Sequence, residues 1–214
     1  MHKKLVLAII VVIFLVSGCS SETAQFPERE MYRHPDAGFA VQLPSTWEKV
    51  YESEQAVSFV DSELGIGFNA RAEFGGLSFY NVESLADEVI KVFEDNKNFT
   101  DIDVISEEQT AITESSYKLI FESTDSLGIR LGTKVFIFDI YPGIRYYLAF
   151  TADKETYYRY DQGFDWLAQS FFVTKDYNEL YQALTPQMPE GHPETENGGK
   201  PSPETNTDKD KKNQ

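Results

Sequence analysis

A nine-residue stretch with strict alternation, IGFNARAEF at residues 66–74, narrows the possible folds of this chain. Its isoleucine, phenylalanines and alanines fall on one side of an extended backbone, and glycine, asparagine, arginine and glutamate fall on the other. Such a strand has one buried and one solvated face, which is typical of antiparallel sheets. Residues 39–44 repeat the pattern and end at Pro44, which cannot donate a backbone hydrogen bond to a neighbouring strand.

Further strands are predicted at residues 47–52, 56–61, 102–109 and 116–124. The segments TKVFIFDI and IRYYLAF are apolar on both faces, as central strands covered by helices would be. The sequence YPG between these two segments predicts a tight turn.

Two longer helices are predicted between the strands. In the first, Ser84 is expected to cap the N-terminus with Asp87 three residues later, and apolar residues follow at helical spacing: Leu85, Val89, Val92 and Phe93. The second spans about residues 154–170 and carries one aromatic face: Tyr157, Tyr160, Phe164, Leu167 and Phe171. Gly163 costs about 1 kcal/mol inside it and marks a place where the helix can kink.

A short third helix is expected at residues 176–184. The order of strands, helix, strands and helix, with short connections, predicts an α+β fold. We expect a mainly antiparallel twisted sheet packed with two to three helices.

Two segments of this domain resemble a known family. DAGFAVQLPSTW at residues 36–47 and YYLAFTADKETYYRYDQGFDWLAQSFF at residues 146–172 are similar to the opening and closing segments of the PsbP-like fold. That family includes PsbP, a eukaryotic Ran-binding protein and bacterial envelope lipoproteins such as DcrB. The resemblance covers residues 32–173 and implies an α/β/α sandwich with an accessory binding role. Its motifs are hydrophobic and turn positions, so no functional residue is carried over.

The N-terminus has the layout of a secretory signal peptide: Lys3 and Lys4 precede an unbroken apolar run at residues 5–16. As a helix this run reaches about 18 Å, short of the roughly 30 Å hydrocarbon core of a bilayer. The sequence LVSGC at residues 15–19 resembles the bacterial lipobox. This resemblance implies cleavage between Gly18 and Cys19 and attachment of diacylglycerol to the Cys19 sulfur. The alternative is an ordinary signal peptide with a chance cysteine.

Cys19 is the single cysteine in the chain, so the exported domain is expected to fold without a disulfide. Diacylglycerol supplies two acyl chains, and two chains anchor a protein stably. The sequence therefore predicts a lipoprotein held on the extracytoplasmic side of a bacterial cell membrane. It leaves open whether the host has one membrane or two.

Composition divides the chain into four parts. Residues 1–18 form the signal peptide, residues 19–30 a lipidated flexible tether and residues 31–184 one domain. Residues 185–214 form a polar tail, and no aromatic residue, leucine, isoleucine or valine occurs in it. A segment of this composition buries too little apolar surface to offset the entropy of ordering it, so disorder is expected.

The charge balance excludes nucleic-acid binding as a function. The chain has 19 basic and 35 acidic residues, and loss of Lys3 and Lys4 with the signal peptide leaves 17 basic residues and a net charge of about −18. Such a surface repels nucleic acid and anionic lipid headgroups.

No catalytic or metal-binding motif is evident. His34 and His192 are expected to be solvated, and neither has the partners of a general base. Residues 95–103 are rich in oxygen ligands, and Asp101 and Asp103 could share a strand face, but the glycine and terminal glutamate of a calcium loop are missing. We therefore expect no enzyme, no metal and no cofactor.

The remaining candidates are aromatic. Tyr158 and Trp166 fall outside the buried stripe of the second long helix and are predicted to form a contact patch. The leading hypothesis is a non-catalytic lipoprotein that binds or supports another envelope component. One alternative is a hydrolase of envelope polymers that uses a pair of acidic residues. Another is a solute-binding lipoprotein, although a single compact domain lacks the second lobe that usually closes over a solute.

Overall fold

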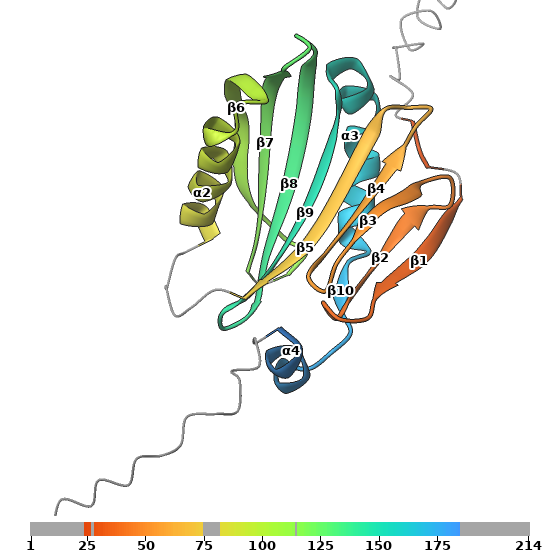
Figure 1. Ribbon diagram of the computed structural model, residues 1–214, viewed down its shortest axis with the longest axis vertical. Coiled ribbons are helices and arrows are strands. Elements are labelled where there is room, and N and C mark those ends of the chain that lie inside the picture. Colours follow the sequence, from red (N-terminus) through yellow and green to blue (C-terminus); the bar gives the residue numbers. More distant parts are fainter. Residues whose placement is uncertain (1–23, 27, 75–81, 114, 185–214) are drawn as a thin grey trace, which may run out of the picture.

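The computed structural model describes residues 24–26, 28–74, 82–113 and 115–184 (Figure 1). The predicted signal peptide, the lipidation site at Cys19 and the polar tail lie outside these residues.

The largest part of the fold is a seven-stranded antiparallel sheet with the strand order β3-β4-β5-β9-β8-β7-β6 (Figure 1). Its strands are β3 (Glu48–Glu52), β4 (Ala56–Asp61), β5 (Ile66–Phe74), β6 (Phe99–Thr110), β7 (Ser116–Asp125), β8 (Arg130–Tyr141) and β9 (Ile144–Asp153). All seven were predicted from the sequence, and the turn between β8 and β9 contains Gly143 with a φ of 78°. A positive φ explains why glycine ends the YPG sequence.

A second, smaller antiparallel sheet has the order β1-β2-β10, with β1 (Arg29–His34), β2 (Phe39–Pro44) and β10 (Phe172–Val173). β2 was predicted, whereas β1 and β10 were not. β1 has the sequence REMYRH and is mostly exposed, so it lacks the apolar alternation that identifies a strand. β10 has two residues and is defined only by its pairing with Ala40 and Phe39 of β2.

Three helices lie in the described residues: α2 (Val82–Asp95), α3 (Lys154–Gln169) and α4 (Tyr177–Leu184). All three were predicted, and together with the two sheets they confirm the α+β fold. The predicted cap of α2 was wrong, because the helix begins at Val82, two residues before Ser84. α3 is capped by Asp153, whose side chain accepts hydrogen bonds from the backbone N–H groups of Glu155 and Thr156.

The two faces of the large sheet are covered differently. α3 packs on β8 and β9 and, with the small sheet, encloses the main hydrophobic core. α2 packs on the opposite face, over β6, β7 and β8. β8 therefore carries apolar residues on both faces because each face meets a helix, as its sequence predicted.

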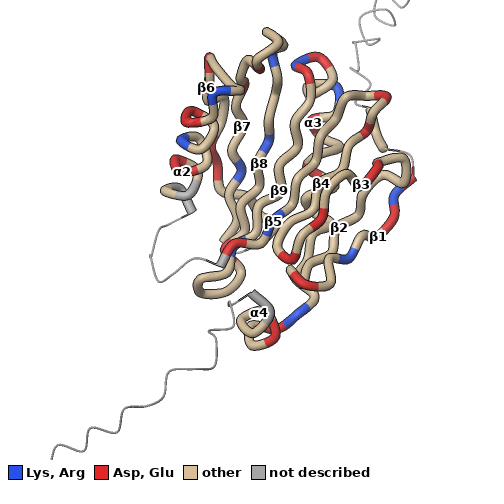
Figure 2. The backbone as a smooth tube through the Cα atoms, in the orientation of Figure 1, with Lys and Arg blue, Asp and Glu red and all other residues tan. Residues whose placement is uncertain are grey.

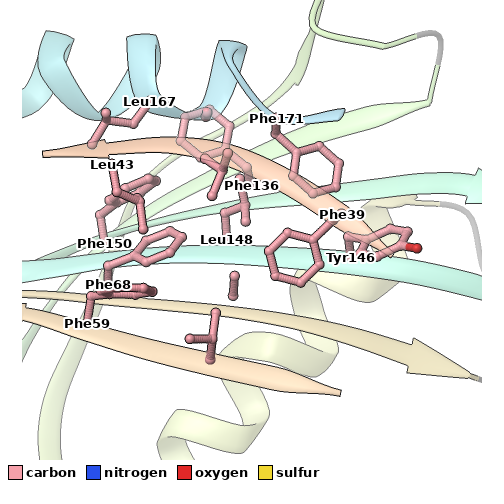
Figure 3. Packing of buried hydrophobic residues seen from close by; sticks show 14 of the residues in the cluster. Phe39, Leu43, Phe59, Phe68, Phe136, Tyr146, Leu148, Phe150, Leu167 and Phe171 are labelled. Carbon is pink, nitrogen blue, oxygen red and sulfur yellow. The ribbon is translucent and has the colours of Figure 1, made fainter. Parts of the chain in front are cut away.

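Aromatic rings fill the main core (Figure 3). Phe150 of β9 stacks on Phe164 of α3, with ring centroids 5.1 Å apart. At the other end, Phe138 of β8 stacks on Phe171 with centroids 4.6 Å apart, and the Tyr146 hydroxyl donates a hydrogen bond to the Ala37 carbonyl. The aromatic face predicted for the second long helix is thus a core face.

The segment before β1 is part of the domain. Phe26 is buried, stacks on Tyr160 with centroids 4.9 Å apart and meets Trp47 edge to face. The boundary of the flexible tether at residue 30 was therefore wrong, because composition alone does not reveal that one phenylalanine finds a pocket. The kink expected at Gly163 is absent, because α3 is continuous there. Gly163 instead makes room for Phe26, since a Cβ at this position would lie 2.9 Å from the Phe26 ring.

Candidate functional site

A groove of about 560 Å³ runs between α2 and the uncovered part of the large sheet. We call it the α2 groove. Its floor is formed by the following residues of β4, β5, β8 and β9: Ser58, Phe59, Val60, Gly67, Phe68, Asn69, Arg71, Glu73, Val135, Tyr147, Ala149 and Thr151. Its wall is formed by Glu88, Val89, Val92, Phe93 and Asn96 together with Phe99 of β6.

The groove exists because α2 covers only half of this sheet face. α2 lies over β6, β7 and β8, at the left of the sheet in Figure 1, reaches only the near side of β9, and leaves β5 and β4 without a helix on this face. The floor there is built from small side chains in cross-strand register: Ser58 pairs with Asn69, and Asn69 pairs with Ala149. Gly67 pairs with Val60 and Thr151 in the next row. Small residues beside a helix leave a hollow that larger ones would fill.

The wall of the groove is apolar. Val89 is buried, whereas Val92 is 60% exposed although it belongs to the predicted apolar face of α2. Phe93 packs edge to face on Phe121 of β7, which fixes the helix against the sheet. An exposed valine beside the buried Val89 and the half-buried Phe93 gives the groove an apolar surface that the fold itself does not cover.

Polar groups lie along the floor. The Asn69 amide donates to the Ser58 hydroxyl (2.9 Å), and the hydroxyls of Thr133 and Thr151 are 3.1 Å apart. Arg71 lies over the Tyr147 ring, with its guanidinium carbon 4.6 Å from the centroid. Burial, helped by the nearby Glu73 carboxylate, raises the pKa of the Tyr147 hydroxyl, which therefore stays protonated.

The groove thus combines an apolar surface with a few oriented polar groups, which is the usual composition of a ligand site. Its volume lies in the range of sites that bind small molecules or several side chains of a peptide. The alternation in residues 66–74 predicted a solvated face with Gly67, Asn69, Arg71 and Glu73, and it did not predict the groove. The small residues Gly67 of β5 and Ala149 of β9 were the available signal.

His34 was predicted to be solvated, and this prediction was wrong. It is buried, its Nδ1 accepts a hydrogen bond from the Ala37 N–H (3.1 Å), and its Nε2 lies 3.4 Å from the Ala56 carbonyl. Since Nδ1 is an acceptor, Nε2 carries the proton and points at that carbonyl. Both ring nitrogens are engaged in the fold, so His34 has a structural role. His192 lies outside the described residues.

The acidic segment at residues 95–103, which leads into β6, is contacted by the Arg130 side chain. The Arg130 Nη1 donates to the Asp101 carbonyl (2.8 Å), and its Nη2 lies 3.9 Å from the Asp103 carboxylate. Asp101 has a φ of 51° and lies at a bulge in β6, which separates it from the regular strand face on which the two carboxylates were expected. Within the described ranges, no group of three or more histidines, cysteines or acidic residues is arranged to hold a metal ion.

The predicted contact residues Tyr158 and Trp166 are both exposed on α3. They are eight positions apart, which separates them by about 12 Å along the helix axis. The Tyr158 hydroxyl donates to the Glu122 carboxylate (2.8 Å), and Lys154 lies over its ring. Tyr158 therefore has a structural contact as well, and a shared contact patch stays a prediction.

Charged residues are unevenly placed. Figure 2 shows acidic residues on the helices, turns and outer strands, and few charges along the central strands. The α2 groove opens from this weakly charged region, with Arg71, Glu73 and Glu88 among its lining residues. None of the helices in the described part of the chain is both long and apolar enough to cross a membrane.

The sequence matches no model of a known protein family and no curated protein. The fold is similar to solved structures. The Ran-binding protein Mog1p of Saccharomyces cerevisiae is 7% identical with a TM-score of 0.55, over 69% of this chain and 96% of Mog1p. CyanoP, the cyanobacterial PsbP of Synechocystis, is 14% identical with a TM-score of 0.53, over 68% of this chain and 92% of CyanoP. At these identities the likeness concerns the fold alone, and the expected PsbP-like fold is confirmed.

Proposed function

We propose that this protein is a membrane-anchored, non-catalytic lipoprotein that binds an apolar segment of another envelope component in the α2 groove. The anchor is diacylglycerol on Cys19, and the domain lies on the extracytoplasmic side of a bacterial membrane. The lipobox-like sequence LVSGC supports the anchor.

The observation that carries the binding role is the exposed apolar wall of the groove. Val92 is 60% exposed on the same helix that buries Val89, and it faces a floor of small residues. Exposed apolar surface that is concave and bordered by polar groups is typical of interaction sites. An extended partner segment could place aliphatic or aromatic side chains against Val92 and Phe93 and its backbone near Asn69.

Site-specific photocrosslinking in intact cells tests this role. A photoreactive amino acid at position 92 is expected to give one discrete, recurring adduct. The control is the same amino acid at position 50, because Val50 is 57% exposed on β3 and does not line the groove. An equal adduct from both positions would contradict binding in the groove, and an adduct of only small mass would indicate a solute.

A matched pair of substitutions tests the energetic contribution. We expect Val92→Gln to reduce the photocrosslinked adduct from position 96 several-fold, because it places a polar amide on the apolar wall. Val50→Gln changes the same residue type at similar exposure and is expected to have no effect. Unchanged adduct in the Val92→Gln protein would show that the wall does not contribute to binding.

The anchor is tested separately by Cys19→Ala. We expect the wild-type protein in the membrane fraction and the variant in the soluble fraction or retained with its signal peptide uncleaved. Metabolic labelling with an alkyne fatty acid, lost in the variant, distinguishes lipidation from adhesion of the protein. Labelling that persists in Cys19→Ala would contradict the proposed site.

One observation favours a second function, the hydrolase of envelope polymers. Glu73 of β5 and Glu88 of α2 line the same groove from its floor and its wall. Against this function, the Arg71 Nη2 lies 3.8 Å from the Glu73 carboxylate, so one of the two acids already has a cationic partner. Hydrolysis of purified peptidoglycan that is lost in both Glu73→Gln and Glu88→Gln would support the hydrolase over the binding role.

A further inference from the structure

The turn between β7 and β8 presents an exposed leucine on a fixed backbone. Leu127 is 82% exposed and Ile129 is 45% exposed. The Asp125 carboxylate accepts hydrogen bonds from the backbone N–H groups of Leu127 (2.9 Å) and Ile129 (2.8 Å). Backbone hydrogen bonds from Gly128 N to Asp125 O and from Asp125 N to Ile129 O, each 3.0 Å, close the turn.

These contacts matter because they hold the apolar side chains outward. Gly128 has a φ of 81°, which the tight turn requires and which most residues avoid. On a flexible loop the leucine side chain could fold back onto the protein surface. The hydrogen bonds of this turn hold the backbone in place and oppose that movement. Among the exposed large apolar side chains of the described residues, Leu127 has the highest exposed fraction.

The turn lies at the end of the molecule where the described chain begins. Ala24 N donates to the Arg159 carbonyl near the start of α3, and Phe26 packs farther along α3, against Gly163. From Phe26 back to Ala24, the described chain therefore runs toward the start of α3. Figure 1 shows the start of α3 and the β7–β8 turn at the same, upper end of the fold, with α4 at the opposite end.

Chain geometry limits how far the anchor can be from this end. Five residue steps separate Ala24 from Cys19, which is a reach of at most about 17 Å. Arg159 lies about 7.5 Å along α3 from its first residue. Leu131 pairs with Asp153, the cap of α3, and Leu127 lies four residues beyond Leu131 in the closed turn, so at most about 13 Å from it. Toward the upper end of the fold, Leu127 therefore stands at most roughly 20 Å beyond Ala24, which is similar to the greatest distance that Cys19 can reach.

We propose that Leu127 and Ile129 form a second membrane contact, in which the β7–β8 turn enters the bilayer interface beside the lipidated Cys19. This inference rests on the proposed anchoring. An anchor held on so short a segment brings the upper end of the domain to the headgroups, where aliphatic side chains are favourable. The domain is strongly acidic, so the contact is apolar and does not require anionic lipid.

Depth-dependent quenching tests the contact. Ser126→Cys places a thiol next to Leu127, and in the mature lipoprotein it is the only free one, because Cys19 is acylated. Gln182→Cys on α4 is the matched control at the opposite end, since both positions are exposed. The full lipoprotein is labelled with a nitrobenzoxadiazole fluorophore and reconstituted in phosphatidylcholine vesicles that contain a lipid with a nitroxide quencher.

We expect at least threefold stronger quenching at position 126 than at position 182. Leu127→Ser in the Ser126→Cys protein is expected to reduce the quenching toward the value at position 182, and phosphatidylglycerol is not expected to increase it. Equal quenching at both positions of a vesicle-bound protein overturns the contact and leaves the turn as a surface for a protein partner. Quenching that requires phosphatidylglycerol overturns the apolar mechanism.

The two proposals can fail separately. Flotation of the vesicles before the measurement reports the anchor, because the Cys19→Ala protein should remain at the bottom of the gradient. If the wild-type protein also fails to float, the anchor is wrong and the membrane contact is wrong with it. If the wild-type protein floats and position 126 is not quenched, only the membrane contact is wrong.

Discussion

The Glu122 carboxylate on β7 is almost completely buried and accepts hydrogen bonds from three side chains. Arg130 Nε lies 3.1 Å away, Lys154 Nζ 2.9 Å and the Tyr158 hydroxyl 2.8 Å. Burial alone would raise the pKa of Glu122, but the hydrogen bonds from Lys154, Tyr158 and Arg130 outweigh it and lower the pKa below that of an ordinary glutamate. This cluster connects β7, β8 and α3.

Glu122→Gln should therefore destabilise the protein in a pH-dependent way. At pH 7 we expect a loss of about 1–2 kcal/mol, because a neutral amide is a weaker acceptor for two cations. A folded-state pKa below the unfolded value gives stability that is present above the unfolded pKa and is lost as the pH falls through the folded pKa. The difference between variant and wild type should shrink as the pH falls below about 4.5.

Urea unfolding between pH 3 and pH 8 measures this difference. Glu107→Gln is a suitable control because Glu107 is an exposed carboxylate on the neighbouring edge strand β6. A constant difference between Glu122→Gln and wild type across the range would contradict an ionised role for Glu122.

Gly132 on β8 is required by the packing of α3. A Cβ at this position would lie 2.4 Å from Tyr157 Cγ and 2.9 Å from Tyr157 Cβ, atoms near the root of a fully buried side chain. Those atoms cannot move without shifting α3 away from the sheet. We expect Gly132→Ala to lower the free energy of unfolding by about 1–3 kcal/mol, measured by urea denaturation.

The control is Gly67→Ala on β5. Its Cβ would meet nothing closer than the Thr151 carbonyl at 3.8 Å, and its φ is not positive. Alanine is therefore accommodated there and restricts the unfolded chain, so a small gain or no change is expected. Equal losses at the two glycines would mean that strand propensity, and not the Tyr157 contact, determines the effect.

Residues 24–26 and helix α3 were predicted as independent segments, and the fold brings them into contact. Phe26 occupies a site between Trp47, Tyr160 and Gly163. Phe26→Ala should cost about 3 kcal/mol, because it empties a buried aromatic site. It should also make the bonds before β1 sensitive to limited proteolysis.

Gly163→Ala is expected to change sign with the residue at position 26. In the native chain the new methyl group would press on the Phe26 ring at 2.9 Å, so the substitution destabilises. In the Phe26→Ala chain that contact is absent, and alanine should stabilise α3 by about 1 kcal/mol. A double-mutant cycle by thermal denaturation measures the coupling. If the effects of Gly163→Ala and Phe26→Ala on stability are additive, the Phe26 ring is not the reason for glycine at position 163.

The helices and the main strands were predictable because each carries its own periodicity. The alternation in β5 and the aromatic stripe of α3 identify both structures from local residues. β1 and β10 were missed because their hydrogen bonds to β2 define them, and their side chains are polar or too few. The role of Gly163 depends on its contact with Phe26, a residue distant in the sequence, which a local pattern does not contain.

The α2 groove could not be predicted for a related reason. The sequence showed that β8 and β9 have two apolar faces, and it did not show that α2 would lie mainly over β6, β7 and β8. The hollow results from this sideways position together with small residues such as Gly67 and Ala149. His34 illustrates the same limit, because its ring is held between the turn that precedes β2 and strand β4.

The unequal cover of the two sheet faces predicts unequal local stability. On one face, α3 and the small sheet enclose a large aromatic core. On the other, the described side chains of α2 bury only Ala86 and Val89 fully, and its outer edge borders the open groove. Local opening requires less free energy where fewer apolar contacts are broken. α2 should therefore open without unfolding of the rest of the domain.

Hydrogen exchange followed by mass spectrometry tests this expectation. Amides of residues 88–95 in α2 should exchange at least tenfold faster than those of residues 160–167 in α3, with little dependence on urea. Amides of α3 should instead exchange only through global unfolding. An occupant of the groove contacts Val92 and Phe93 and binds only the closed helix, so it should slow exchange in α2 selectively. Equal protection of the two helices would contradict a locally mobile wall, and the groove would then be a rigid, preformed site.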